Sequence, residues 1–276
     1  MQKTFEISGP VDLNVELTAG DIVVAPGSDG SVEVELVAHD AESQELVDNA
    51  TVELRGREVF VQIQKKGGWF NFRNRGITCT IKCVDGSSLR ARTKSGDIEA
   101  DIDLARAWVN TASGDISLRN VSGDLSANSA SGDTTAGNVG GRANVNSASG
   151  DVKLGTVGGD VSANTASGDI SVDAAGGSVK ANSASGDISV AATGNGDVSV
   201  NSASGDVGIG LRGGTRAHLD CNTVSGDTRS ELGLSGDEPQ GDAPLVHIKV
   251  RTVSGDIHIY SARTSASADT AQEVQA

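Results

Sequence analysis

The spacing of apolar residues divides the chain into two regions. Up to about residue 92, apolar and polar positions alternate in short runs such as VDLNVEL at 11–17, SVEVELVA at 31–38 and ITCTIKC at 77–83. Alternation with a period of two is typical of β-strands that bury one face. We therefore predict an antiparallel β cap over residues 1–92.

One stretch of this first region breaks the alternation. Residues 40–50, DAESQELVDNA, carry Leu46, Val47 and Ala50 at helical spacing. This spacing predicts one short helix within the cap.

The second region, residues 93–260, is built from an internal repeat. A weaker glycine lies about halfway between consecutive Ser-Gly-Asp triplets, so each unit of nine residues offers one strand and one tight corner. Ile and Val one and three residues after each Asp, as in Ile170 and Val172, point to one face of that strand. The triplet begins at Ser95, Ser113, Ser131, Ser149, Ser167, Ser185, Ser204, Ser225 and Ser254.

Two strands per 18 residues predict an all-β fold, a two-sided parallel β-solenoid (β-helix) whose coils stack about 4.8 Å apart. The run LVHIKVRTVSGDIHIYS at 245–261 is predicted to close the open end of the stack. The remaining tail, 261–276, is small and polar, which predicts disorder. An open solenoid end also leaves a homodimer as one option.

Two polar columns follow from the repeat. The asparagines four residues before each repeat glycine are predicted to hydrogen-bond along the stack, with no chemistry implied. The aspartates of the triplets would place carboxylates about 4.8 Å apart. The two columns are Asn110, Asn128, Asn146, Asn164, Asn182, Asn201 and Asn222, and Asp97, Asp115, Asp133, Asp151, Asp169, Asp187, Asp206, Asp227 and Asp256.

Like charges at that spacing repel, so the aspartate column needs an explanation. We favour carboxylates that accept hydrogen bonds from corner amides. Structural calcium is the first alternative, although one Asp per coil supplies few ligands. The second is a glycan-active β-helix enzyme with paired carboxylates, which the scarcity of aromatics and cations in the repeats disfavours. We therefore predict no enzyme activity and no cofactor, with calcium as the alternative.

Composition narrows the class of protein further. Thirty-six glycines and only two Trp, one Tyr and four Phe suit a thin core of Val, Ile, Leu and Ala. A formal charge of −15 argues against nucleic acid as the main partner. The odd, sparse set of Cys79, Cys83 and Cys221 is interpreted as small buried residues rather than a disulfide framework or a metal site.

The sequence also bears on location. The start MQKTFEISGP lacks the apolar core of a signal peptide, and no run approaches the ~20 apolar residues of a membrane span. We expect a cytoplasmic protein whose membrane contacts are peripheral, at the inner face of the membrane.

The segment KKGGWFNFRNRG at 65–76 concentrates bulk and positive charge in an acidic chain. One interpretation is a hydrophobic plug over the first coil. The other is a binding site for an anionic membrane surface or an unidentified protein partner. The candidate site residues are Lys65, Lys66, Trp69, Phe70, Phe72, Arg73 and Arg75.

With TAGDIVV at 18–24, the repeated NSASGD units and the ending TVSGDIHIY at 252–260, the chain resembles the toastrack family, DUF4097, whose members carry the label "putative adhesin". The resemblance covers nearly the whole chain. It implies a bacterial β-strand-repeat scaffold, often associated with cell-envelope or membrane-stress systems. Together with the arguments above, it predicts a non-catalytic scaffold or interaction module.

Overall fold

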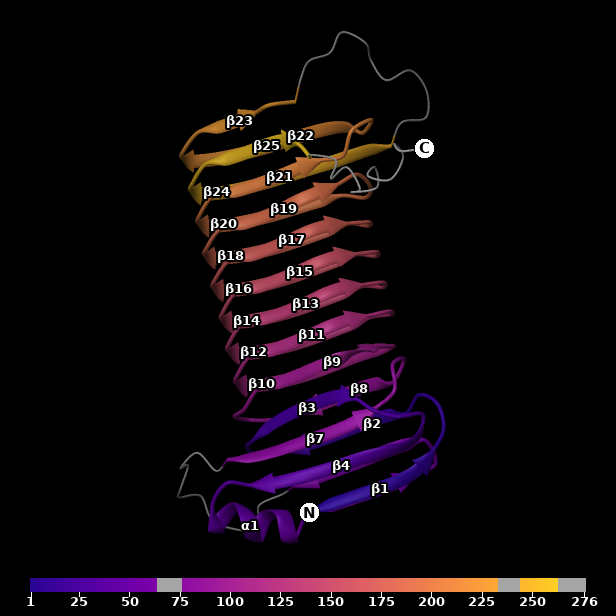
Figure 1. Ribbon diagram of the computed structural model, residues 1–276. Coiled ribbons are helices and arrows are strands. Elements are labelled where there is room, and N and C mark those ends of the chain that lie inside the picture. The colour runs from indigo at the N-terminus through magenta and orange to yellow at the C-terminus, as the bar shows by residue number, and fades with distance from the viewer. Residues whose placement is uncertain (64–75, 233–243, 263–276) are drawn as a thin grey trace, which may run out of the picture.

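The protein is a long stack of short strands. The computed structural model describes residues 1–63, 76–232 and 244–262. Their strands form two sheets that run along one axis, with the N-terminus and the one helix of these residues, α1 (Ala41–Asp48), at one end (Figure 1). The predicted two-sided, all-β architecture is confirmed.

Each sheet follows the stack from end to end. In spatial order, the 13-strand sheet of the described residues contains β1 (Gln2–Ile7), β4 (Gly30–Ala38), β7 (Ile77–Cys83), β3 (Asp21–Pro26), β9 (Ile98–Leu104), β11 (Ile116–Val121), β13 (Thr134–Val139), β15 (Val152–Val157), β17 (Ile170–Ala175), β19 (Ile188–Thr193), β21 (Val207–Leu211), β25 (Ile257–Ser261) and β23 (Thr228–Ser230). The 12-strand sheet contains β22 (Arg216–Ser225), β24 (Leu245–Ser254), β20 (Val198–Ser204), β18 (Val179–Ser185), β16 (Val161–Ser167), β14 (Ala143–Ser149), β12 (Leu125–Ser131), β10 (Arg106–Ser113), β8 (Ser88–Arg92), β2 (Asp12–Leu17), β6 (Glu58–Ile63) and β5 (Thr51–Arg55).

The 18-residue period sets the register of both sheets. In the 13-strand sheet Ile116 pairs with Thr134, and in the 12-strand sheet Ala107 pairs with Leu125, each partner lying eighteen residues away. Both pairings are parallel. Identical repeat positions therefore stack directly on one another, which turns each repeated residue into a column.

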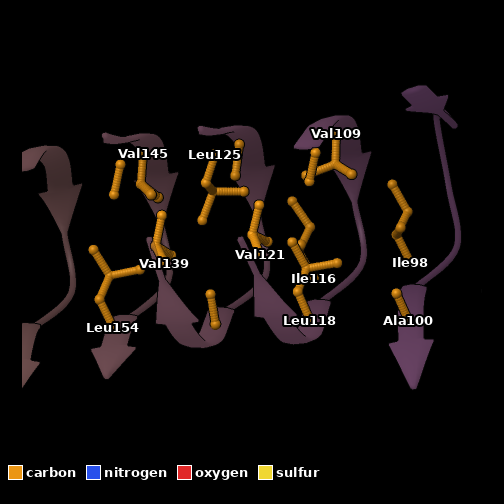
Figure 2. Close-up of a cluster of buried hydrophobic side chains, with 14 of the residues drawn as sticks. Ile98, Ala100, Val109, Ile116, Leu118, Val121, Leu125, Val139, Val145 and Leu154 are labelled. Atoms are coloured by element: carbon orange, nitrogen blue, oxygen red, sulfur yellow. The ribbon is translucent and has the colours of Figure 1, made fainter. Parts of the chain in front are cut away.

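The core is the thin apolar layer between the two sheets. Figure 2 shows Val109, Leu125 and Val145 from one row of strands, with Ile116 and Leu154 from the other. These side chains are buried, as are their counterparts in the inner coils of the stack. Small and β-branched residues fill this space because the two sheets lie close together, which confirms the interpretation of the composition.

Thr134 interrupts a column of buried apolar residues in the 13-strand sheet. Thr134 lies between Ile116 and Val152, is fully buried, and its Oγ1 atom has no hydrogen-bond partner among the described residues. A buried unpaired hydroxyl destabilises a protein by about 1–3 kcal/mol. We expect Thr134→Val, which has nearly the same shape, to raise the free energy of unfolding by about 1 kcal/mol. Urea denaturation would check this, and a loss of stability would contradict it.

The N-terminal cap is mixed rather than wholly antiparallel. The predicted antiparallel pairs are present, since β1 pairs with β4, β4 with β7, and β5 with β6. However, β2 and β3 pair in parallel with strands on both of their sides. These two strands form an early coil of the solenoid. Both sheets therefore continue without a break across residue 92. The domain boundary predicted there stays a prediction.

The helix in the cap is confirmed. Asp40 precedes α1, and its Oδ1 atom accepts the backbone N–H of Ser43 at 2.6 Å. This is an N-cap, which satisfies one of the free N–H groups of the first turn. Val47 is buried against the core, with Leu46 and Ala50 partly buried, as their helical spacing indicated.

The C-terminal end differs from the prediction. The last strand pair, β24 and β25, does not close the stack but lies one coil inside it, between β20–β21 and β22–β23. Inward positions of β24 and β25 carry Val and Ile side chains, which are buried because a coil packs on each side of them. Their counterparts on β23, Thr228 and Ser230, are polar and exposed, so this coil tolerates the end position.

Two of the three cysteines are buried, as the sequence interpretation expected. Cys79 and Cys83 point inward from β7 and are fully buried, whereas Cys221 is half-buried on β22. Burial raises the pKa of Cys79 to about 12. It also raises the pKa of Cys83, against the opposing effect of a hydrogen bond with Ser87.

These environments predict one reactive thiol. We expect Ellman's reagent at pH 8 to label Cys221 in the folded protein and all three cysteines in denaturant, because only a solvent-accessible thiolate reacts. The variant Cys221→Ser should show no fast reaction. Labelling of two or more thiols in the folded protein would contradict this placement.

Candidate functional site

The aspartate column forms a hydrogen-bonded ladder at one corner of the stack. The Oδ1 atom of Asp115 accepts the backbone N–H of Asp133, and that of Asp133 accepts the N–H of Asp151, each at 2.8 Å. The ladder starts at Asp21, which accepts the N–H of Asp97 at 3.0 Å. These bonds confirm the interpretation that the carboxylates accept hydrogen bonds from backbone N–H groups at the corners.

At the C-terminal end of the stack, the aspartates are linked in the spatial order of their coils and not in their order along the chain. The Oδ1 atom of Asp206 accepts the N–H of Asp256, and that of Asp256 accepts the N–H of Asp227, both at 2.8 Å. The order reverses because β25 lies inside β23. Each carboxylate therefore bridges two coils, and the repulsion between neighbours is offset by N–H dipoles directed at them.

The asparagine column forms a second ladder, on the outer face of the 12-strand sheet. Nδ2 atoms donate to Oδ1 atoms one coil away at 2.7–3.0 Å. The bonds join Asn128, Asn146, Asn164, Asn182 and Asn201. Both repeated polar columns thus stabilise the stacking of coils, as expected for amide ladders.

A polar cluster on the 13-strand sheet was not predicted. Arg119 donates from Nη2 to Asp85 and from Nε to Asp103, both at 3.0 Å. The hydrogen bond from Asn120, followed by the contacts with Arg119, lowers the pKa of Asp103. Asp103 and Arg119 lie in neighbouring coils but outside the repeated triplet, so the motif gave no signal for the cluster. The cluster is an ion pair network without a nucleophile.

The outer face of the 12-strand sheet carries an aromatic residue between cations. The guanidinium carbons of Arg90 and Arg92 lie 5.6 and 5.2 Å from the ring centroid of Trp108. Arg90 and Trp108 pair across β8 and β10. Trp108 lies eighteen residues after Arg90, one full repeat period, so the two stack in neighbouring coils.

The predicted contact segment falls almost entirely within residues 64–75, which are outside the described part of the chain. Its candidate site residues lie outside the described residues, and their role stays a prediction: Lys65, Lys66, Trp69, Phe70, Phe72, Arg73 and Arg75. The strands on either side, β6 and β7, belong to different sheets.

The carboxylates outside the ladder form no metal centre among the described residues. The described part of the chain contains no group of three His, Cys, Asp or Glu side chains able to hold a metal ion. A pocket near the N-terminal end includes Asp29 and Asp85. Asp29 accepts the N–H of Gly9 at 2.9 Å, and Asp85 accepts that of Asp103 at 2.8 Å. Both carboxylates thus support the backbone. The one helix of the described residues, α1, is not long and apolar enough to cross a bilayer.

Comparison with known proteins decides the family. The model of the family named Toastrack DUF4097 matches residues 11–260, nearly the whole chain. The chain belongs to the toastrack family. The resemblance seen in the sequence motifs is thereby confirmed. No curated protein matches this toastrack chain.

Three solved structures are similar to this toastrack protein over most of their length. A putative adhesin from Bacteroides fragilis is 18% identical, with 94% of this chain and 96% of that chain covered and a TM-score of 0.45. A putative adhesin and a putative lipid binding protein, both from Parabacteroides distasonis, are 10% and 15% identical. Each has the same coverage of 94% and 96% and a TM-score of 0.37.

Proposed function

We propose that this toastrack protein acts without catalysis, as a rigid β-solenoid scaffold whose outer faces bind a partner. One observation carries the proposal. The carboxylates that recur in every coil, which were the main candidates for acid–base chemistry or calcium binding, accept backbone N–H groups of the next coil. Their repetition is therefore explained by stacking, and the outer faces remain as the surfaces for interaction.

The enzyme alternative has a direct test. We would incubate the purified protein with neutral and acidic polysaccharides and measure new reducing ends over time. The scaffold proposal predicts no turnover above that of heat-denatured protein. Turnover that disappears in Asp133→Asn or Asp151→Asn would overturn it, because those variants retain the acceptor atom of the ladder.

We also propose that residues 65–75 contribute a contact surface for an anionic membrane or an acidic protein. The support is the sequence, where Trp69, Phe70 and Phe72 lie among four cations. Co-sedimentation with vesicles of phosphatidylglycerol and phosphatidylcholine would test it. Binding by the native chain and not by the double variant Trp69→Ala/Phe70→Ala is expected. Equal sedimentation of both, or of neither, would refute the membrane contact.

A further inference from the structure

The outer face of the 12-strand sheet contains a long surface without carboxylates. Along β8, β10, β12, β14, β16, β18, β20 and β24, two outward positions per strand form two adjacent rows, one from Arg90 to Lys249 and one from Arg92 to Arg251. We call these two rows the acid-free strip. At a strand spacing of about 4.8 Å, the eight strands span about 34 Å.

The strip has the opposite charge to the molecule as a whole. It carries five exposed cations, Arg90, Arg92, Lys180, Lys249 and Arg251, and otherwise one tryptophan, asparagines and serines. Carboxylates return on the flanking strands, with Glu16 on β2 and Asp220 on β22. They also return at the corner that precedes the strip, where Asp124, Asp160 and Asp197 are exposed. In a chain with 37 acidic and 22 basic residues, this surface stands out as a site of positive potential.

The cations of the strip are free to bind a ligand. None of the five forms an ion pair or a side-chain hydrogen bond with another residue in the described part of the chain. Glu16, which pairs with Arg92 in the sheet register, instead accepts a hydrogen bond from Gln62 at 3.0 Å. Arg90 and Arg92 are oriented by the ring of Trp108.

We propose that the acid-free strip binds a linear acidic polysaccharide that runs along the solenoid axis. Guanidinium and ammonium groups would pair with the carboxylates of the glycan. Trp108 offers an aromatic ring at the end where two arginines meet, and the asparagine amides and serine hydroxyls between the cations can hydrogen-bond sugar hydroxyls. This inference rests on the proposed scaffold function and names the class of its ligand.

The spacing of charge favours a glycan over other polyanions. Nucleic acid carries a phosphate at every nucleotide and needs a dense basic track, which five cations over about 34 Å and a net charge of −15 do not supply. A membrane surface requires exposed apolar side chains. The exposed large hydrophobic residues of the described chain are Met1, Val37, Leu219, Val224, Leu245 and Val253, and none lies in the strip.

Binding to polygalacturonate, measured by isothermal titration calorimetry at low salt, tests the proposal. Arg90→Ala/Arg92→Ala and Lys249→Ala/Arg251→Ala should each weaken binding roughly tenfold, as expected for the loss of charge-assisted contacts. The matched control is Lys153→Ala/Arg229→Ala, which removes the same charge from the 13-strand sheet and should change affinity less than twofold. Circular dichroism would confirm that all variants fold.

Several results would overturn the inference. They are the absence of polygalacturonate binding, equal losses in strip and control variants, equal binding of uncharged dextran, or tighter strip-dependent binding of oligo-deoxythymidine. These outcomes leave the scaffold proposal intact. Only the release of reducing ends from the polysaccharide would refute that proposal, so the two failures are distinguishable.

Discussion

Replacing Gly150 by alanine should destabilise the protein by about 3 kcal/mol or more. Gly150 has φ +142°, a backbone conformation that L side chains rarely adopt. An added Cβ would lie 2.1 Å from the carbonyl oxygen of Gly132 in the preceding coil. Because that oxygen belongs to the backbone, the clash can be relieved only by separating two coils that the ladders hold together.

Two control variants separate the causes of this effect. Gly213→Ala meets no atom within 4 Å and involves no left-handed backbone, so it should remain within about 0.5 kcal/mol of the native protein. Gly30→Ala, at φ +101° and also in open space, should lose about 1 kcal/mol from backbone strain alone. Urea midpoints of the three variants would be compared. Equal midpoints for Gly150→Ala and Gly213→Ala would contradict close packing of the corners.

Deletion of one whole coil should be tolerated, whereas deletion of half a coil should prevent folding. Removing residues 152–169 joins Asp151 to Ile170, so that β13 meets β17 and β14 meets β18 with every column in register. Repeat proteins are stabilised mainly by contacts between neighbouring units, so the shortened protein should melt within a few degrees of the native one.

Removing residues 152–160 is the matched comparison. It moves every later strand into the opposite sheet and stacks corners of different types on one another. The aspartate ladder would end at Asp151, since the following corners would present no triplet aspartate in register. We expect loss of the cooperative transition in circular dichroism, with aggregation. Cooperative melting of both deletions would show that the 18-residue coil is not the unit of register.

The parts of the structure that repeat could be predicted from the sequence. The recurrence of the Ser-Gly-Asp triplet every eighteen residues predicts the corner, the inward face of each strand and the carboxylate column. It does so because parallel stacking brings identical repeat positions together. The ladder through Asp133 and Asp151 follows from that logic. The helix at 41–48 was predictable for a local reason, its Asp40 cap and apolar spacing.

The parts that depend on long-range order could not be predicted in the same way. Sequence order placed β24 and β25 last, but their buried Val and Ile side chains are covered on both sides only in the penultimate position. The polarity of Thr228 and Ser230 was the signal for the true end.

The central claim is that the repeated aspartates hold the stack together and bind neither calcium nor substrate. Thermal unfolding of variants with Asp133, Asp151, Asp169 and Asp187 all changed to Asn, or all to Ala, in EDTA and in calcium, tests it most directly. We predict that the Asn variant melts with the native protein, because its Oδ1 atoms still accept the corner N–H groups. The Ala variant should lose about 2–4 kcal/mol, and calcium should shift none of the three. A calcium-dependent rise in melting temperature that the Asn variant lacks would contradict the claim.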